Sequence, residues 1–321
     1  MLSDAILKNQ LKFTLDKTNF KLGKKYEGKV RDNYTFDGKR MIITTDRISA
    51  FDRVLCTIPF KVQVLNQTAA FWFEKTKNII ENHIISIPDP NVMLAKECRP
   101  LPVEMVVRGY ITGVTTTSAW YNYEKGVRNF CGNILPEGLK KNQKLAKPII
   151  TPSTKAEHGA HDESVSGEEI IKRKLVDEKM YRQMEKTALA LFDFGTKLVA
   201  KNNLILVDTK YEFGELNGKL VLIDEAHTPD SSRFWINSTY QELFSKGQEP
   251  QKLDKEYLRM WLSEKGFVGE GKIPTIPDEV KVEAAKRYIT AYEMITGKNF
   301  EAKNEDVMGR IERNLKKMLD N

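Results

Sequence analysis

Short runs of alternating hydrophobic and polar residues dominate the N-terminal part of the chain. Residues 26–34 and 41–45 are rich in β-forming residues, and Asp37-Gly38, a dipeptide typical of tight turns, separates them. This pattern predicts an antiparallel sheet. The period then changes over residues 65–80, where a set of positions recurs at three- and four-residue intervals and predicts a helix that covers the sheet. The positions are Leu65, Ala69, Trp72, Phe73, Thr76 and Ile80.

Helical periodicity returns after residue 166. Ser166 followed by Glu169 is the signature of a capping box, and the periodic positions continue as far as Leu198. Asn202-Asn203 is expected to end this helical region. Further helices are predicted over residues 257–262, 280–295 and 307–319, the second of them closed by Gly297.

These elements predict an α+β fold with two domains. Residues 86–100 contain prolines among polar residues and are expected to form a loop that leads into a strand over residues 103–108. We therefore expect a smaller, antiparallel β-rich N-terminal domain over residues 1–108 and a larger α/β domain over residues 109–321 that carries the C-terminal helices. Residues 109–166 show little periodicity, and so long an irregular stretch in a compact chain indicates function.

Composition narrows the class of protein. The chain has 321 residues, of which 40% are hydrophobic and 30% charged, as suits a globular protein with a substantial core. No apolar run approaches the roughly 18 residues of a membrane span. The first ten residues have neither the basic start nor the apolar core of an export signal. We therefore expect a cytoplasmic protein that has no membrane partner.

The net charge and the spacing of cysteines and histidines limit the classes of ligand that the chain is expected to bind. The formal net charge of +7 favours anionic partners. The basic runs are short and are not interleaved with aromatic residues, so phosphorylated small molecules are expected rather than nucleic acid. The three cysteines are widely spaced and are expected to be free thiols. The four histidines form no pair at metal-ligand spacing, which disfavours a zinc or iron enzyme.

The densest charge pattern lies in a predicted hairpin of two strands, residues 204–213 and 220–224. Strand alternation places Asp208, Lys210 and Glu212 on one face, with Val207 and Tyr211 on the other, and Asp224 ends the partner strand. Carboxylates that converge from two strands suit a Mg²⁺ ion bridging nucleotide phosphates. An exposed face of salt bridges would show the same spacing.

Two further segments suit phosphate groups. Lys29 and Arg31 follow Gly28 and would share one face of a strand, as suits a polyphosphate or, alternatively, a charged edge strand. Ser231, Ser232 and Arg233 follow the hairpin, and hydroxyls beside a planar guanidinium suit a monophosphate. A Ser turn would explain the same residues.

Two histidine-containing stretches complete the candidates. Residues 151–162 combine hydroxyls, a lysine and two histidines without an apolar anchor, as suits a ligand-binding loop or a surface loop. His227 lies in the acidic and hydroxyl-rich segment after the hairpin, and we expect it to be a packed residue rather than a catalyst.

Six segments, in this order, resemble those of the phosphoribosylaminoimidazole-succinocarboxamide synthase family. The resemblance covers residues 24–236 and continues more weakly to about residue 300. The segments are GKVRD at residues 28–32, TTDRISAFD at 44–52, PVEMVVRGYITG at 102–113, TPSTKAEHG at 151–159, DTKYEFG at 208–214 and TPDSSRFW at 228–235.

The resemblance implies a nucleotide cleft between the two domains, broadly as in protein kinases and ATP-grasp enzymes. It implies an ATP-dependent ligase of de novo purine biosynthesis. In this family, ATP phosphorylates the carboxylate of carboxyaminoimidazole ribonucleotide, and the amine of L-aspartate then displaces phosphate. Phosphorylation converts a carboxylate oxygen into a good leaving group, so the protein contributes mainly positioning and charge neutralisation.

The resemblance also implies roles for individual residues. ATP would contact Lys29, Arg31 and Glu104. Lys210 and Asp208 would be catalytic, and Glu212 and Asp224 would hold Mg²⁺. The substrate-binding residues would be Ser49, Asp52, Arg108, Ser118, Lys155, His161, Asp162, Ser232 and Arg233.

One departure from the family pattern follows Gly113. Family members commonly run from this glycine directly into serine and an aromatic residue, whereas residues 114–117 intervene here before Ser118. Either Ser118 keeps the substrate role or Thr115 takes it. We favour Ser118, because Ser118 followed by Ala119-Trp120 restores the motif.

The shared metal site leads to a prediction about the hairpin loop. A two-residue Asn217-Gly218 turn would place Glu212 opposite Ile223 and turn Asp224 to the other face. A three-residue loop that includes Lys219 would place Glu212 opposite Asp224, with Gly218 at a positive φ. We therefore predict the three-residue loop or an equivalent bulge.

Two other function classes fit part of the pattern. A small-molecule kinase with a similar cleft would release ADP without needing L-aspartate. A nucleic-acid-binding protein would account for the net charge, but it predicts clustered basic and stacking aromatic residues.

Overall fold

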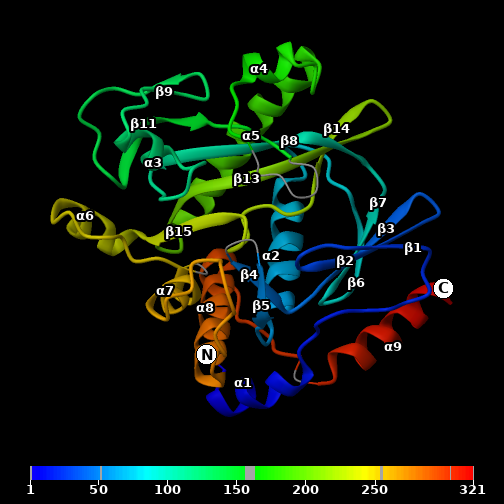
Figure 1. The fold of residues 1–321 in the computed structure, drawn as a ribbon. Helices are drawn as coiled ribbons and strands as arrows, with labels where there is room; N and C mark the ends of the chain where they lie inside the picture. Colours follow the sequence, from blue (N-terminus) through cyan, green and yellow to red (C-terminus); the bar gives the residue numbers. More distant parts are fainter. Residues whose placement is uncertain (1, 51–52, 156–162, 254–255, 304, 321) are drawn as a thin grey trace. The chain divides into compact units, whose positions relative to one another are not determined.

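The computed structural model describes residues 2–50, 53–155, 163–253, 256–303 and 305–320 (Figure 1). The chain divides into two compact units, each described by itself below. The first comprises Met1–Phe71, His83–Glu97 and Leu253–Asn321, and the second comprises Trp72–Asn82 and Cys98–Lys252.

This division differs from the expected boundary at residue 108. Strand β8 (Arg99–Ile111) runs without a break through that position, so a boundary there would cut a strand in the middle of a sheet. The C-terminal helices also belong to the first unit, because their apolar faces pack with N-terminal residues in a shared core.

The first unit contains a five-stranded antiparallel sheet of order β1-β2-β3-β7-β6. Its strands are β1 (Lys24–Glu27), β2 (Arg31–Phe36), β3 (Lys39–Thr44), β7 (Val92–Lys96) and β6 (Ile84–Asp89). Apolar residues of β2, β3 and β7 pack against α9 (Val307–Leu319), and the cluster includes Tyr34, Met41, Ile311 and Leu315. The predicted antiparallel sheet is confirmed.

The expected continuous run over residues 26–34 is wrong. It is interrupted between β1 and β2, where the Gly28 N–H donates to the Arg31 carbonyl at 2.7 Å and closes a turn. Lys29 therefore lies in the turn and Arg31 begins the next strand, so the two cations do not alternate along one strand.

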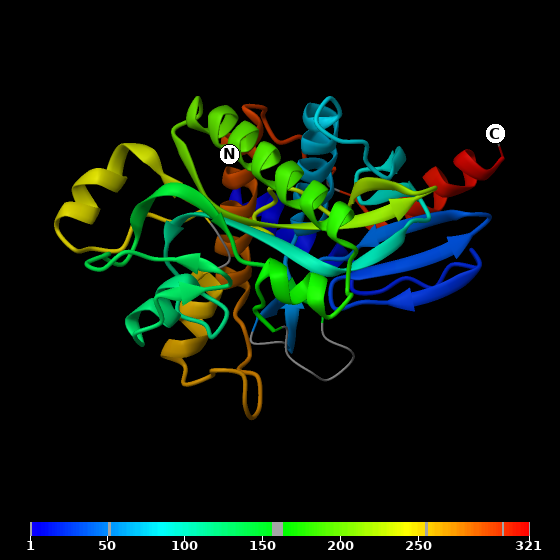
Figure 2. The ribbon, with the colours of Figure 1, turned by 90° about the horizontal axis from the view of Figure 1, so that it is seen from above.

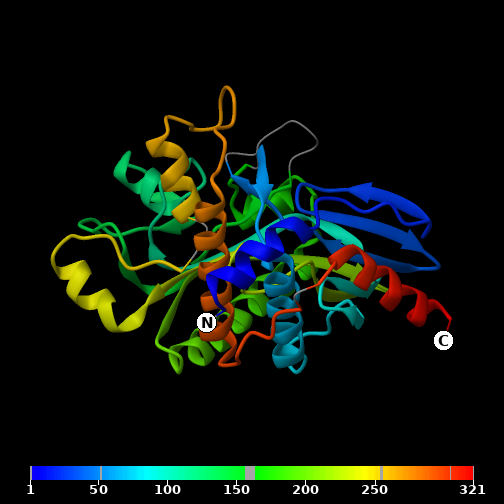
Figure 3. The same cartoon turned by 90° about the horizontal axis from the view of Figure 1, so that it is seen from below.

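A second core of the first unit is helical. It joins α1 (Asp4–Gln10), the hairpin of β4 (Arg47–Ala50) and β5 (Arg53–Thr57), the first part of α2 (Lys61–Thr76), α7 (Glu256–Glu264) and α8 (Asp278–Thr296). A short 3₁₀ turn, η1 (Leu11–Phe13), follows α1. Helix α1 lies beside α8 (Figure 3). Gly297 ends α8 at a φ of 68°, as the sequence predicted.

The second unit is built on a six-stranded antiparallel sheet. The path β11-β8-β13-β14 places β13 at its centre, and β12 pairs with β8 while β15 pairs with β13. The remaining strand bounds are β11 (Gln143–Ile150), β12 (Ser153–Thr154), β13 (Leu204–Leu216), β14 (Lys219–Ile223) and β15 (Ser232–Ile236). Helix α5 (Glu178–Ala200) packs across β13 and β8 (Figure 2).

The expected helical region after Ser166 is two helices. The Ser166 hydroxyl caps α4 (Gly167–Lys172) by accepting from the Glu169 N–H at 3.1 Å. Lys174 then adopts a positive φ of 56°, which ends the helix, and Asp177 caps α5. The other elements of the unit are α3 (Ala119–Glu124), β9 (Asn129–Phe130), β10 (Asn133–Ile134) and α6 (Asn237–Ser245).

Two expectations from composition can be compared with the described residues. Cys56, Cys98 and Cys131 are free thiols, as expected. None of the helices in the described ranges combines the length and apolar content that crossing a bilayer requires.

Candidate active site

The central strand β13 supplies the charged face that the sequence predicted. Lys210 and Glu212 are partly exposed, whereas Tyr211 and Phe213 are buried. The alternation fails at Val207, because a β-bulge lies between Leu206 and Asp208 in the pairing with β15. Val207 packs with Tyr110 and Trp235 instead of continuing the alternation that begins at Asp208.

A cluster of lysines and carboxylates surrounds Lys210. The Lys210 Nζ donates to Glu104 Oε1 at 2.5 Å and to Glu212 Oε1 at 2.7 Å. Glu104 lies on β8 directly opposite Glu212, so register places their carboxylates on one face. The Lys155 ammonium also donates to Glu212. Each buried carboxylate in this cluster therefore has a cationic neighbour.

The partners hold this cluster in its charged form. Burial opposes the charge on Lys210, but Glu212, Glu104 and Asp224 outweigh burial and raise its pKa. Burial likewise opposes ionisation of Glu212, and the charges of Lys210 and Lys155 outweigh it and lower the pKa of that carboxyl. Lys210 and Glu212 are consequently both ionised across the neutral range.

The hairpin between β13 and β14 has the shorter loop, so the predicted three-residue loop is wrong. Leu216 pairs with Lys219, and Glu212 lies opposite Ile223. Asn217 and Gly218 have φ values of 51° and 77°. Two successive positive φ angles are the type I′ pattern, whose twist matches that of the flanking strands.

Asp224 nevertheless reaches the surroundings of Lys210. Strand β14 ends at Ile223, and Asp224 has a positive φ of 66°, so strand alternation no longer determines the direction of its side chain. Its carboxylate is among the charges that raise the pKa of Lys210. Asp224 is thus close enough to Lys210 to act on its charge, but it does not pair with Glu212 in the ladder.

Two arginines meet one aspartate on the same face of the sheet. Asp208 pairs in register with Arg108 on β8 and with Arg233 on β15. Its Oδ2 accepts from Arg233 Nη1 at 2.6 Å and from Arg108 Nη1 at 3.3 Å. Arg108 also donates to Thr151 Oγ1 at 2.7 Å and to the Thr117 carbonyl at 2.9 Å. Burial lowers the pKa of Arg108, and Asp208 offsets part of that effect.

Hydroxyl groups border the arginines at Gly113. A Cβ on Gly113 would lie 2.4 Å from Ser118 Oγ and 3.3 Å from Arg233 Nη1, so these two groups flank the glycine. Thr115 Oγ1 lies 2.8 Å from Ser118 Oγ, and the Thr115 N–H donates to the same oxygen at 3.3 Å. The inserted residues 114–117 thus bring both candidate hydroxyls to one place.

Some predicted substrate residues are not brought to this cluster. The Ser232 hydroxyl is buried and donates to Thr209 Oγ1 at 2.7 Å, on the side of β13 opposite to Asp208. Ser49 lies half-buried on β4 in the first unit. Lys155, by contrast, belongs to the cluster around Lys210, because its ammonium donates to Glu212. Asp52, His161 and Asp162 lie outside the described residues.

Sequence reasoning missed a buried contact beneath this face. Tyr211, which points away from Lys210, shares a hydrogen bond between its hydroxyl and His227 Nε2. His227 is fully buried, and burial lowers its pKa to about 3. Gly195 of α5 permits the approach, because a Cβ there would lie 2.4 Å from His227 Cε1. The expected packing role of His227 is confirmed. Gly195, on the helix that covers this face, was the sequence feature that could have predicted the contact.

Oxygen donors of the kind that Mg²⁺ prefers are present around Lys210, in Glu104, Glu212 and Asp224. Within the ranges that the structure describes, no group of three or more His, Cys, Asp or Glu side chains is arranged to hold a metal ion. Mg²⁺ in proteins commonly takes one or two carboxylates and completes its shell with phosphate and water, so these three carboxylates are the candidate ligands.

The chain is similar to known proteins over most of its length. A family model described as SAICAR synthetase matches residues 24–276. The phosphoribosylaminoimidazole-succinocarboxamide synthase of Legionella pneumophila (strain Paris) is 47% identical over 311 residues, which cover 96% of this chain and 99% of that protein.

Solved structures show the same fold. The SAICAR synthase of Saccharomyces cerevisiae, complexed with SAICAR, has a TM-score of 0.79 and 31% identity, covering 90% of this chain and 100% of that one. A SAICAR synthetase in complex with ADP has a TM-score of 0.66 and 24% identity, covering 87% of this chain and 100% of that one.

Proposed function

The chain belongs to the SAICAR synthetase family of purine-biosynthesis ligases, and we propose that it joins carboxyaminoimidazole ribonucleotide to L-aspartate in an ATP-dependent reaction. One observation carries the proposal. The central sheet of the second unit presents an arginine pair and a lysine–carboxylate cluster on one face.

The spacing of the two clusters suits a nucleotide that is bound at one end and activated at the other. Asp208, between the arginines, and Lys210 are two residues apart on β13, a separation of about 6.6 Å along a strand. Arg108 and Arg233, with Ser118 and Thr115 beside Gly113, would bind the 5′-phosphate. The imidazole carboxylate would then extend towards Lys210.

The reaction proceeds in two balanced steps. An oxygen of the substrate carboxylate forms a bond to the γ-phosphorus of ATP, and the bond to the β,γ-bridging oxygen breaks to release ADP. The amine of L-aspartate then bonds to the acyl carbon, loses a proton and expels phosphate. The positive charge of Lys210 offsets negative charge on the phosphoryl group during its transfer.

Two carboxylates would serve a magnesium ion in this scheme. Glu212 and Asp224 supply the hard oxygen donors that Mg²⁺ prefers, and both act on Lys210. When bound, the ion would supply neutralisation of polyphosphate charge.

ATP itself would be held by Lys29 and Arg31 of the first unit. Lys29 lies in the turn after Gly28, and Arg31 begins β2. The ADP complex of a similar protein supports a nucleoside triphosphate as the phosphoryl donor.

The test is a coupled assay in which ATP, L-aspartate or carboxyaminoimidazole ribonucleotide is omitted in turn. We expect release of ADP and phosphate and formation of the amide product only when all three are present. ADP release that continues at the full rate without L-aspartate would instead identify a kinase.

A further inference from the structure

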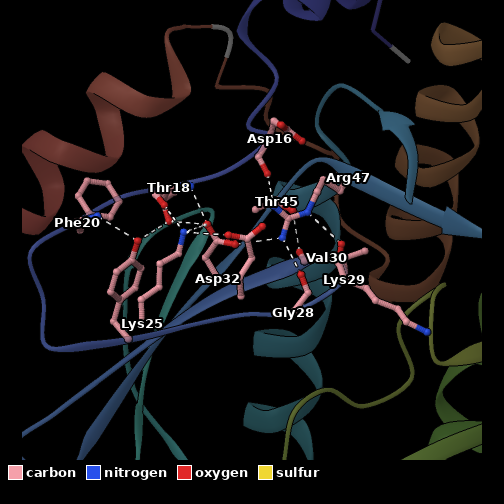
Figure 4. Close-up of polar contacts among 12 residues, drawn as sticks. Asp16, Thr18, Phe20, Lys25, Gly28, Lys29, Val30, Asp32, Thr45 and Arg47 are labelled. Carbon is pink, nitrogen blue, oxygen red and sulfur yellow. Dashed lines mark hydrogen bonds and ion pairs between the residues drawn. The ribbon is translucent and has the colours of Figure 1, made fainter. Parts of the chain in front are cut away.

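The Arg47 side chain is buried in the first unit, with 5% of the residue exposed. Its Nε donates to the Lys29 carbonyl at 3.0 Å, and its Nη2 donates to the Gly28 carbonyl at 2.9 Å (Figure 4). Nη1 donates to the Asp16 carbonyl. Two of the three guanidinium nitrogens of Arg47 therefore donate to main-chain carbonyls of a single turn, the turn that joins β1 and β2.

Thr45 completes the set of donors on this turn. Both its N–H and its hydroxyl donate to the Val30 carbonyl, each at 2.9 Å. The carbonyls of three successive residues, Gly28, Lys29 and Val30, thus all accept hydrogen bonds from Arg47 or Thr45. Figure 4 shows these contacts converging from one side of the turn.

The orientation of the carbonyls determines the orientation of the amides. In a trans peptide the C=O and the following N–H point in opposite directions, and the described residues contain no cis peptide. Each N–H of Lys29, Val30 and Arg31 therefore points away from the donor that the preceding carbonyl meets. Successive backbone N–H groups in a turn are a recurring anion-binding arrangement. Figure 4 shows the Lys29 side chain extending away from the Arg47 guanidinium as well.

A buried carboxylate fixes the guanidinium that organises the turn. Asp32 is fully buried, and its Oδ1 accepts from Arg47 Nη2 at 3.1 Å. Its Oδ2 accepts from the Thr18 N–H at 2.6 Å and from the Thr18 hydroxyl at 2.8 Å. Burial opposes ionisation, but the hydrogen bonds from Thr18 and Arg47 outweigh it and lower the pKa of Asp32. Arg47 is therefore held against a buried carboxylate that is ionised at neutral pH.

From these contacts we infer that Arg47 is a positioning residue for the triphosphate of ATP. It acts through the Gly28-Lys29-Val30 turn, whose carbonyls it turns inward so that the amides and the Lys29 side chain face the phosphates. The inference rests on the proposed use of ATP at this turn. Arg47 itself donates inward and does not touch the nucleotide.

The sharpest test compares Arg47→Met with Arg40→Met. Arg40 is the control, because it forms a two-point pair with Glu97, Nε–Oε2 at 2.9 Å and Nη2–Oε1 at 2.7 Å. It lies on β3 opposite Thr35, at the other end of that strand from Thr44, which pairs with Arg31. The probes are ATP, inorganic tripolyphosphate and adenosine, the latter two as competitive inhibitors. The wild-type enzyme must first turn over the three substrates, so failure of the proposed function is recognised separately.

Arg47→Met is expected to raise the KM for ATP and the inhibition constant of tripolyphosphate by about tenfold or more, the effect of losing charge-assisted hydrogen bonds. The inhibition constant of adenosine and the KM for the imidazole nucleotide should change by less than about twofold, and Arg40→Met should leave all four constants at the wild-type values. Equal increases for adenosine and tripolyphosphate, or a lower melting temperature with unchanged constants, would overturn the inference.

Two further variants keep the test decisive if Arg47→Met does not fold. Arg47→Lys keeps the charge but replaces the planar fork with a single ammonium, and should show a smaller shift that is still confined to ATP and tripolyphosphate. Thr45→Val removes one of the two donors to the Val30 carbonyl and should shift the same two constants. Shifts in the imidazole nucleotide KM in both variants would contradict a positioning role.

Discussion

Individual charged residues of the candidate site are held by partners on neighbouring strands. Asp208 is shared by Arg108 and Arg233, and Lys210 is shared by Glu104 and Glu212. In the proposed complex, a ligand group would take over contacts that an internal partner makes in the free protein. This arrangement orients the side chains before binding. It also means that a substitution destabilises the fold more when the charged partner left behind is more deeply buried.

Replacing Arg233 tests the phosphate end of the site. Its side chain is 31% exposed, compared with 8% for Arg108, so Arg233→Ala disturbs the fold less. We expect the KM for the imidazole nucleotide to rise by the equivalent of roughly 1.5 to 3 kcal/mol, with the KM for ATP nearly unchanged. Steady-state kinetics with each substrate varied in turn provides the measurement.

A surface arginine of the same unit serves as the control for Arg233. Arg182 on α5 pairs with Glu185 at 2.9 Å and lies far from β15 in sequence. Arg182→Ala should leave both constants unchanged. An effect of Arg233→Ala confined to ATP would show that the ATP and nucleotide sites have been exchanged.

Replacing Lys210 tests the site of phosphoryl transfer. In the proposed reaction the Lys210 charge matters most while the phosphoryl group lies between two oxygens, so Lys210→Met should lower kcat by about a hundredfold or more. The KM values of ATP and of the imidazole nucleotide should change little. Lys197→Met, which removes only a surface pair with Asp193, should behave as wild type. A change in KM alone would assign Lys210 to ground-state binding.

At the scale of elements, sequence predicted best where one residue determines a local conformation. Ser166 caps its helix and Gly297 ends α8, because a hydroxyl acceptor and a positive φ are properties of those residues themselves. The strand over residues 26–34 was predicted wrongly, because the turn at Lys29 is stabilised by Arg47 and Thr45, which are distant in sequence.

The hairpin loop is a second element that the sequence predicted wrongly, here because a local turn preference was overruled by an assumption about Asp224. The longer loop was predicted on the assumption that strand alternation continues through Asp224. The chain instead uses the locally favoured Asn217-Gly218 turn and changes direction at Asp224 with a positive φ. Aspartate tolerates a positive φ but does not require one. The faces of Lys210 and Glu212 were therefore predictable, and the position of Asp224 was not.

The turn predicts a difference between two substitutions at Gly218. Its φ is 77° and a Cβ there would meet no atom within 4 Å, so any penalty comes from the backbone conformation alone. Gly218→Val should lower the free energy of unfolding by about 1 to 2 kcal/mol, whereas Gly218→Asn should lower it less, because asparagine tolerates this region. Urea unfolding at neutral pH provides the measurement. Equal losses for the two variants would contradict a purely conformational origin.

At the scale of the whole molecule, the association of distant segments was the least predictable feature. The sequence predicted α8 and α9 as helices, but not which residues would cover them. Both pack with N-terminal segments, α8 with Leu7 and Phe60 and α9 with Tyr34. Hydrophobic burial is non-directional, so an amphipathic pattern identifies a buried face without identifying its partner.

Two buried histidines make the stability of the folded chain depend on pH. Burial lowers the pKa of His227 in the second unit to about 3, and burial is also the main cause that lowers the pKa of His83 in the first unit to about 3. The ordinary value is 6.5, so below that pH the unfolded chain binds protons that the folded chain does not. Their contribution is complete above pH 6.5 and decreases as the pH falls towards 3. Asp46 acts in the opposite direction, because its pKa is raised to about 6.

His227→Gln isolates one of these terms, because glutamine can still accept from the Tyr211 hydroxyl but does not titrate. Between pH 7.5 and pH 5.0 the wild type should lose about 2 kcal/mol more than His227→Gln, one pKa unit being about 1.4 kcal/mol. Tyr211→Phe is the control. It removes the hydrogen bond but keeps a buried neutral imidazole, so it should lower stability by a similar amount at both pH values. The measurement is the free energy of unfolding in urea for the three proteins at the two pH values. If His227→Gln showed the same pH dependence as the wild type, the loss of stability at low pH would arise elsewhere in the chain.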